Sequence, residues 1–149
     1  MILDIKTLDH ANVLTLRCRK YKYQVTNING YTLYIGLLGY SIDNQYYKLT
    51  PDGYITAKCM YAYDGPSGPT KDDEHNLVPA LVHDIIYQAI RRGELPMSVK
   101  EFADDLLQTM MIERGASKKR AQMYHDGVHL FAASSCQPGT DDLGMLVVM

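Results

Sequence analysis

The chain has 149 residues, a length typical of one domain and sufficient to bury a hydrophobic core. Hydrophobic residues make up 46% of the chain, charged residues make up 21%, and the formal net charge is −2. This composition indicates a globular rather than a disordered protein. Because the charge is nearly balanced, nothing attracts the chain generally to nucleic acid or to anionic membranes. We therefore expect one soluble domain over residues 1–149 and no nucleic-acid partner.

The cysteines and the N-terminus indicate folding in a reducing cytoplasm. Cys18, Cys59 and Cys136 are odd in number and widely spaced, which argues against a disulfide framework or a zinc knuckle. Asp4 and Asp9 interrupt the region in which a signal peptide needs an unbroken apolar run. No stretch reaches the length of a membrane span, so neither a signal peptide nor a transmembrane segment is expected.

The first 68 residues show the alternation typical of strands. Apolar residues alternate over residues 14–18, slip in phase, and alternate again over residues 21–25. Asn29-Gly30 and Pro51-Asp52-Gly53 predict tight turns, and the second turn precedes a long alternating run over residues 55–63. This pattern predicts an antiparallel β-meander of four or five strands.

After Pro69 the periodicity becomes helical, and three helices are predicted over residues 69–133. The first should cover residues 76–92 and end at Gly93, and the second should cover residues 98–115, with Ser98 and Glu101 forming a capping box. The third should cover residues 117–133. The predicted fold is therefore α+β, with an N-terminal antiparallel β-meander followed by three α-helices, the first two forming a helical hairpin. Residues 134–149 are expected to be a C-terminal tail.

Two of these helices bring a histidine and an aspartate together. On a helical wheel of about 100° per residue, His83 lies in the middle of an apolar arc and Asp84 points away from that arc. On the second helix Asp104 borders the apolar arc, whereas Asp105 lies on the polar side. Because a buried imidazole needs a hydrogen-bond partner, we expect His83 to be buried against Asp104 and Asp105 to be solvated.

A histidine paired with a buried aspartate is a general-base unit. No serine or cysteine is placed as a nucleophile, so water is the natural attacker, and Asp84 could hold a metal ion that polarises the substrate. The loop over residues 63–70 is rich in glycine and proline and can turn carbonyl groups toward a calcium ion. The alternative interpretations are a core histidine satisfied by Asp104 and an ordinary connecting loop.

The third predicted helix carries a competing metal site. His125 and His129 are four residues apart, a spacing that can bind zinc. The chain has no HExxH motif, and both histidines lie beside the apolar stripe of their helix. The alternative is that they are solvated residues on the flank of that helix.

Four segments in the same order resemble an uncharacterised family of phage and prophage proteins, known only as a domain of unknown function. They are DGPSGPT (residues 64–70), LVHDIIYQ (81–88), FADDLL (102–107) and RAQMYHDGVHLF (120–131). This resemblance covers roughly the C-terminal two-thirds of the chain. It implies a phage origin, with synthesis in the host cytoplasm and possible incorporation in the virion, and it implies no activity.

The order Tyr-x-Gly, HD-x-x-Y, Gly-x-x-Pro and Ala-Asp is similar to phospholipase A2, closest to the disulfide-free form of parvovirus capsid proteins. Here these motifs begin at Tyr63, His83, Gly93 and Ala103. The resemblance implies that His83 activates water, that Asp104 orients His83, and that calcium is held by one carboxylate and three carbonyls. These ligands would be Asp84, Tyr63, Gly65 and Gly68. The loop has one residue more between its glycines than the family pattern, which puts Gly68 in doubt.

Two functions follow as hypotheses. The first is a phage-encoded, calcium-dependent ester hydrolase of the phospholipase A2 type, with a phospholipid or another ester as its substrate. A site lined by Val82, Ile86 and Ile90 would prefer acyl chains. The alternative is a non-catalytic virion or tail component that keeps the helical hairpin for packing. Its C-terminal tail would then contact other phage structural proteins.

Overall fold

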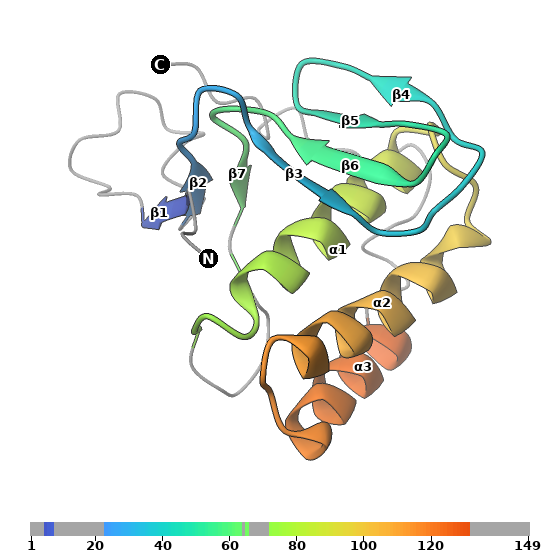
Figure 1. Cartoon of the computed structure of the whole chain (residues 1–149). Coiled ribbons are helices and arrows are strands. Elements are labelled where there is room, and N and C mark those ends of the chain that lie inside the picture. The colour runs from blue at the N-terminus through green and yellow to red at the C-terminus, as the bar shows by residue number, and fades with distance from the viewer. Residues whose placement is uncertain (1–4, 8–22, 64, 66–71, 132–149) are drawn as a thin grey trace. The chain divides into compact units, whose positions relative to one another are not determined.

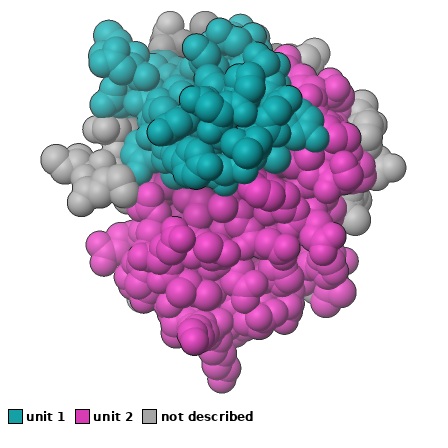
Figure 2. Space-filling view, turned by 45° about the vertical axis from the view of Figure 1, so that its right-hand side comes forward, with its two compact units in different colours: residues 1–64, 142–149 teal, residues 65–141 magenta. Residues whose placement is uncertain are grey.

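The computed structural model describes residues 5–7, 23–63, 65 and 72–131. The chain divides into two compact units, coloured separately in Figure 2. Residues 1–64 with 142–149 form the first unit, and residues 65–141 form the second. All described strands lie in the first unit and all described helices lie in the second (Figure 1). The predicted α+β class, an antiparallel strand set followed by three helices, is confirmed.

The strands of the first unit form two antiparallel sheets in the part of the chain that the structure describes. One has the order β1-β2-β7 and the other has the order β3-β6-β5-β4. The bounds are β1 Ile5–Thr7, β2 Tyr23–Val25, β3 Tyr31–Tyr34, β4 Ile42–Asp43, β5 Tyr47–Leu49, β6 Tyr54–Ala57 and β7 Ala62–Tyr63. Strands β4, β5 and β6 follow the expected meander, while β3 pairs with the other edge of β6. The strand expected over residues 14–18 lies outside the described residues.

Both predicted turns of this unit are confirmed. The Gly30 N–H donates to the Asn27 carbonyl at 2.9 Å, and the Gly53 N–H donates to the Thr50 carbonyl at 3.0 Å. Gly30 has a φ of 76°, and a Cβ there would lie 2.4 Å from the Ala57 carbonyl oxygen. Only glycine fits that position, because it tolerates positive φ and has no side chain to collide with the neighbouring strand.

The alternating run over residues 55–63 contains two strands, and the predicted count of four or five strands for this half is wrong because the structure describes seven. Strands β6 and β7 belong to different sheets, and a turn separates them in which the Tyr61 N–H donates to the Lys58 carbonyl at 3.0 Å. Met60 in this turn has a φ of 79°. Every other non-glycine residue that the structure describes has a negative φ. Burial also stops alternating here, because residues 61–63 are all buried.

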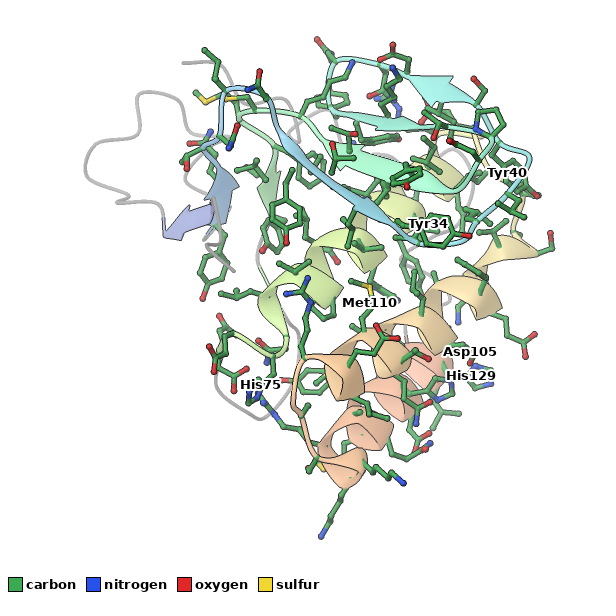
Figure 3. The ribbon with its side chains drawn as sticks, viewed as in Figure 1. Tyr34, Tyr40, His75, Asp105, Met110 and His129 are labelled. Atoms are coloured by element: carbon green, nitrogen blue, oxygen red, sulfur yellow. The ribbon has the colours of Figure 1, made fainter. Side chains whose placement is uncertain are left out.

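Tyrosines fill much of the core of the first unit. The rings of Tyr23 and Tyr63 lie 5.7 Å apart, and the ring of Tyr61 lies 6.4 Å from that of Tyr47 and 6.5 Å from that of Tyr63. All four side chains are buried, whereas Tyr34 on β3 is exposed (labelled in Figure 3). These tyrosines therefore divide between buried core positions and an exposed position on β3.

The second unit contains helices α1 (Leu77–Arg91), α2 (Val99–Glu113) and α3 (Lys118–Phe131). Helix α2 packs against both α1 and α3, so the predicted hairpin of the first two helices is confirmed. Helix α1 is buried on almost all sides. Between α2 and α3 lies an apolar cluster of buried side chains: Leu107, Met111, Ala116, Ala121 and Tyr124. No helix among the described residues is long and apolar enough to cross a membrane.

Helices α1 and α2 end in the same way. Gly93 has a φ of 76° and Gly115 has a φ of 101°. The N–H groups of Gly93 and Glu94 donate to carbonyls of the last turn of α1, and those of Gly115 and Ala116 do so on α2. This is the Schellman arrangement, in which a glycine in the left-handed conformation lets the chain satisfy the last carbonyls of a helix. Both glycine ends were predicted correctly.

The predicted capping box at the start of α2 is wrong. Ser98 makes no side-chain capping bond. Its φ and ψ are −60° and −18°, which are already helical. The N–H groups of Val99 and Lys100 donate to the carbonyls of Pro96 and Met97 at 3.0 Å each, so a turn of backbone leads into the helix. At the start of α3 the Ser117 hydroxyl does accept the Arg120 N–H, at 3.1 Å.

Candidate functional site

The site centres on the pairing of His83 on α1 with Asp104 on α2. His83 Nε2 lies 2.9 Å from Asp104 Oδ1. His83 is 6% exposed and Asp104 is fully buried, whereas the Asp105 side chain is 62% exposed. The prediction that His83 is buried against Asp104 and not Asp105 is confirmed. Helical periodicity allowed Asp104 to be distinguished from Asp105, because consecutive residues of α2 point in directions about 100° apart.

Asp104 accepts hydrogen bonds from two further side chains. The Tyr87 hydroxyl donates to Asp104 Oδ1 at 2.6 Å, and Lys100 Nζ donates to Asp104 Oδ2 at 2.7 Å. Tyr87 lies four residues after His83, and the two rings lie 4.0 Å apart. Lys100 lies four residues before Asp104. Both spacings place the partners on one face of a helix, so α1 supplies two donors to the carboxylate and α2 supplies one.

These donors keep a buried carboxylate ionised. Burial by itself raises the pKa of Asp104, but the bonds from His83, Lys100 and Tyr87 outweigh it and lower the pKa to about 2. Burial also disfavours the charged form of His83, yet the neighbouring Asp104 and Asp84 raise the pKa of the imidazole above its usual value. The pair therefore consists of a permanent anion and a histidine that readily takes up a proton.

The ionised carboxylate determines which nitrogen of neutral His83 carries the hydrogen. Since Asp104 Oδ1 is an acceptor, Nε2 must be the N–H, which leaves the lone pair on Nδ1. Nδ1 lies 3.9 Å from Asp84 Oδ1. That distance is too long for a direct hydrogen bond and suits a bridging water molecule. Nδ1 is thus the atom of this site that could accept a proton from a water molecule.

The expected calcium ligands are only partly described. Asp84 has a side chain that is 38% exposed, and its carboxylate is the hard oxygen donor that calcium prefers. Gly65 has a φ of 80°. Gly68 lies outside the described residues, and Tyr63 belongs to the first unit. No group of three or more His, Cys, Asp or Glu side chains that could hold a metal occurs among the described residues. Asp84 is compatible with a calcium ligand, and the other donors would be backbone carbonyls.

The second histidine pair takes part in a different contact. His125 Nε2 lies 2.8 Å from Asp105 Oδ1, and the rings of His125 and His129 stack 5.7 Å apart (Asp105 and His129 are labelled in Figure 3). The His125 side chain is 18% exposed and that of His129 is 53% exposed, so His129 lies on the solvated flank of α3 while His125 is half-buried. Burial tends to lower the pKa of His125, but Asp105 and Asp126 outweigh this effect and raise the pKa. His125 connects α2 to α3 and does not contact the His83–Asp104 pair.

The acyl-chain surface expected on α1 is not supported. Val82, Ile86 and Ile90 are at most 1% exposed, so they belong to the core. The sequence predicts no role for two residues of the site, Tyr87 and Lys100. Tyr87 closes the HD-x-x-Y motif, and Lys100 lies four residues before Asp104. The spacing of four residues on a helix was the signal available for both.

Comparisons of the chain with protein-family models, with curated proteins and with solved structures find no match. The chemistry of the site therefore has to be inferred from its own residues.

Proposed function

We propose that the protein is a calcium-dependent ester hydrolase in which His83 and Asp104 activate a water molecule. The observation that carries the proposal is the 2.9 Å contact between His83 Nε2 and a fully buried, ionised Asp104. This contact leaves the lone pair of Nδ1 directed away from Asp104. A histidine oriented in this way by a carboxylate is the general base of many hydrolases.

The reaction proceeds through proton transfers at one nitrogen. His83 Nδ1 takes a proton from water while the water oxygen attacks the ester carbonyl carbon. The resulting imidazolium is stabilised by Asp104, which stays ionised. His83 then gives the proton from Nδ1 to the leaving alkoxide as the carbon–oxygen bond breaks, so the products are a carboxylic acid and an alcohol. Tyr87 and Lys100 hold the carboxylate in place throughout.

Calcium would be held by the Asp84 carboxylate, and the similarity to phospholipase A2 implies backbone carbonyls of the Tyr-x-Gly loop as its other ligands. When bound, it would offset the negative charge that develops on the carbonyl oxygen. The substrate class is an ester, with phospholipid favoured by the similarity of the motifs to phospholipase A2.

One observation favours a second function, that of a non-catalytic virion or tail component. Asp104 accepts hydrogen bonds from three donors, and His83 is almost entirely buried. A closed polar network of this kind can fix the packing of two helices without taking part in any reaction. In that case the helical hairpin is a structural element, and the C-terminal tail would contact other phage proteins.

Hydrolysis by the wild type and by His83→Gln separates the two functions. Both proteins are assayed with phospholipid vesicles and with a soluble ester at millimolar calcium. Loss of the base should lower the rate at least about 100-fold, the contribution typical of general-base catalysis. His75→Gln is the matched control, because His75 precedes α1 and lies outside the network. A calcium-loaded wild type that cleaves neither substrate would favour the structural component.

A further inference from the structure

Lys100 occupies the side of the Asp104 carboxylate that the His83 dyad leaves open. Its Nζ lies 2.7 Å from Asp104 Oδ2, while His83 and Tyr87 both bond Oδ1. The same ammonium group donates to the Val128 carbonyl of α3 at 3.4 Å and lies 5.9 Å from the centre of the Tyr87 ring. The lysine is therefore held by an anion, a backbone carbonyl and an aromatic ring, which come from three different helices.

This arrangement fixes the plane of the carboxylate. With donors on Oδ1 alone, the group could rotate about its Cβ–Cγ bond and weaken the bond to His83. Among the described residues, the exposed His129 also lies near Asp104 Oδ2. Its Nδ1 is 4.0 Å from that oxygen. That distance is too long for a hydrogen bond, so Lys100 supplies the described hydrogen bond to Oδ2.

We propose that Lys100 is a positioning residue of the dyad, which orients Asp104 toward His83 and ties its carboxylate to the backbone of α3. This inference rests on the proposed function and adds a residue to it. Lys100 does not transfer protons itself, because its ammonium bonds Oδ2 while His83 bonds Oδ1. It balances the negative charge of the ionised carboxylate. Its effect on the reaction is therefore indirect and passes through the His83 Nε2–H bond.

The test compares three variants in two measurements. Lys100→Met removes the donor, and Lys100→Gln keeps a donor four residues before Asp104, a spacing at which glutamine can bond an aspartate. Lys119→Met is the control, because Lys119 is exposed on the first turn of α3. The first measurement is kcat and KM for ester hydrolysis. The second is the NMR resonance of the His83 Nε2–H proton at fixed pH, which needs no activity.

In Lys100→Met we expect kcat to fall roughly 10- to 100-fold with KM unchanged, as follows from misplacing a catalytic group. The Nε2–H resonance should broaden or disappear. Lys100→Gln should restore the resonance and most of the rate, and Lys119→Met should behave like the wild type. A folded Lys100→Met protein that keeps both the resonance and kcat would overturn the inference.

The two measurements separate this inference from the proposed function. If the wild type is inactive but the resonance changes as expected, Lys100 positions Asp104 and the hydrolase proposal fails. If the wild type is active and the resonance is the same in Lys100→Met, the inference fails alone. Should Lys100→Met not fold, Lys100→Ala is measured in ammonium chloride and in potassium chloride. Recovery of the resonance by ammonium supports the inference, and equal spectra in the two salts contradict it.

Discussion

The ionised state of Asp104 should contribute measurable stability, and Asp104→Asn removes it. The pKa of Asp104 is about 2 in the folded protein, below the ordinary aspartate value of 3.8. At about 1.36 kcal/mol per pH unit, this difference corresponds to about 2 kcal/mol. Because the folded-state pKa is lowered, the stabilisation is complete above the unfolded pKa of 3.8. It is lost as the pH falls through the folded pKa.

Urea denaturation of the wild type and Asp104→Asn between pH 2 and pH 7 measures this contribution. Asparagine resembles the protonated aspartate, so the wild type should be more stable by about 2 kcal/mol near pH 7. The difference should shrink below about pH 4 and nearly vanish near pH 2. Asp105→Asn is the control, since an exposed carboxylate should contribute less than about 1 kcal/mol. A difference between the wild type and Asp104→Asn that stays constant over this range would refute the reasoning.

Two further predictions concern the metal site. Millimolar calcium should raise the melting temperature through preferential binding to the native state. Asp84→Asn should abolish this rise without unfolding the protein, whereas Glu113→Gln, at an exposed position on α2, should keep it. Substitution of both His125 and His129 by alanine should leave the calcium shift and the hydrolysis rate per folded molecule unchanged. Neither residue bonds His83, and His129 Nδ1 lies 4.0 Å from Asp104 Oδ2, too far for a hydrogen bond. Zinc bound by the wild type and lost in this double variant, as measured by metal analysis, would contradict the assignment.

The helical unit could be predicted closely because helical geometry is local. Gly93 and Gly115 mark ends that depend only on a positive φ after the last turn. The contact between His83 and Asp104 joins residues 21 positions apart, yet it too followed from local geometry. Each residue lies at the apolar face of its own helix, and a helical hairpin brings two such faces together. A buried histidine facing a buried carboxylate then follows from the need to satisfy both groups.

The strand unit was predicted less well because alternation does not reveal where a chain leaves a sheet. The residues between Ile55 and Tyr63 keep an apolar period of two, but the chain turns at Met60 and enters the β1-β2-β7 sheet. A positive φ at methionine has no signal in the sequence, since the conformation is imposed by tertiary contacts. The same applies to Ser98, whose capping role is replaced by carbonyls of the preceding turn. The bonds of Lys100 to two helices likewise depend on where α3 lies.

A catalytic His83 and a packing His83 require the same contacts at Nε2 but different contacts at Nδ1. Both require the Nε2–H bond to Asp104 and the donors from Tyr87 and Lys100, so that network cannot separate them. At Nδ1 they differ. A packing histidine would gain most from a donor aimed at its lone pair, whereas the carboxylate oxygen recorded near Nδ1, Asp84 Oδ1 at 3.9 Å, is an acceptor. Two acceptors at this separation are suited to a water molecule that donates to both. A water held in this way would be the nucleophile of the proposed hydrolase, and a purely structural hairpin has no need of it.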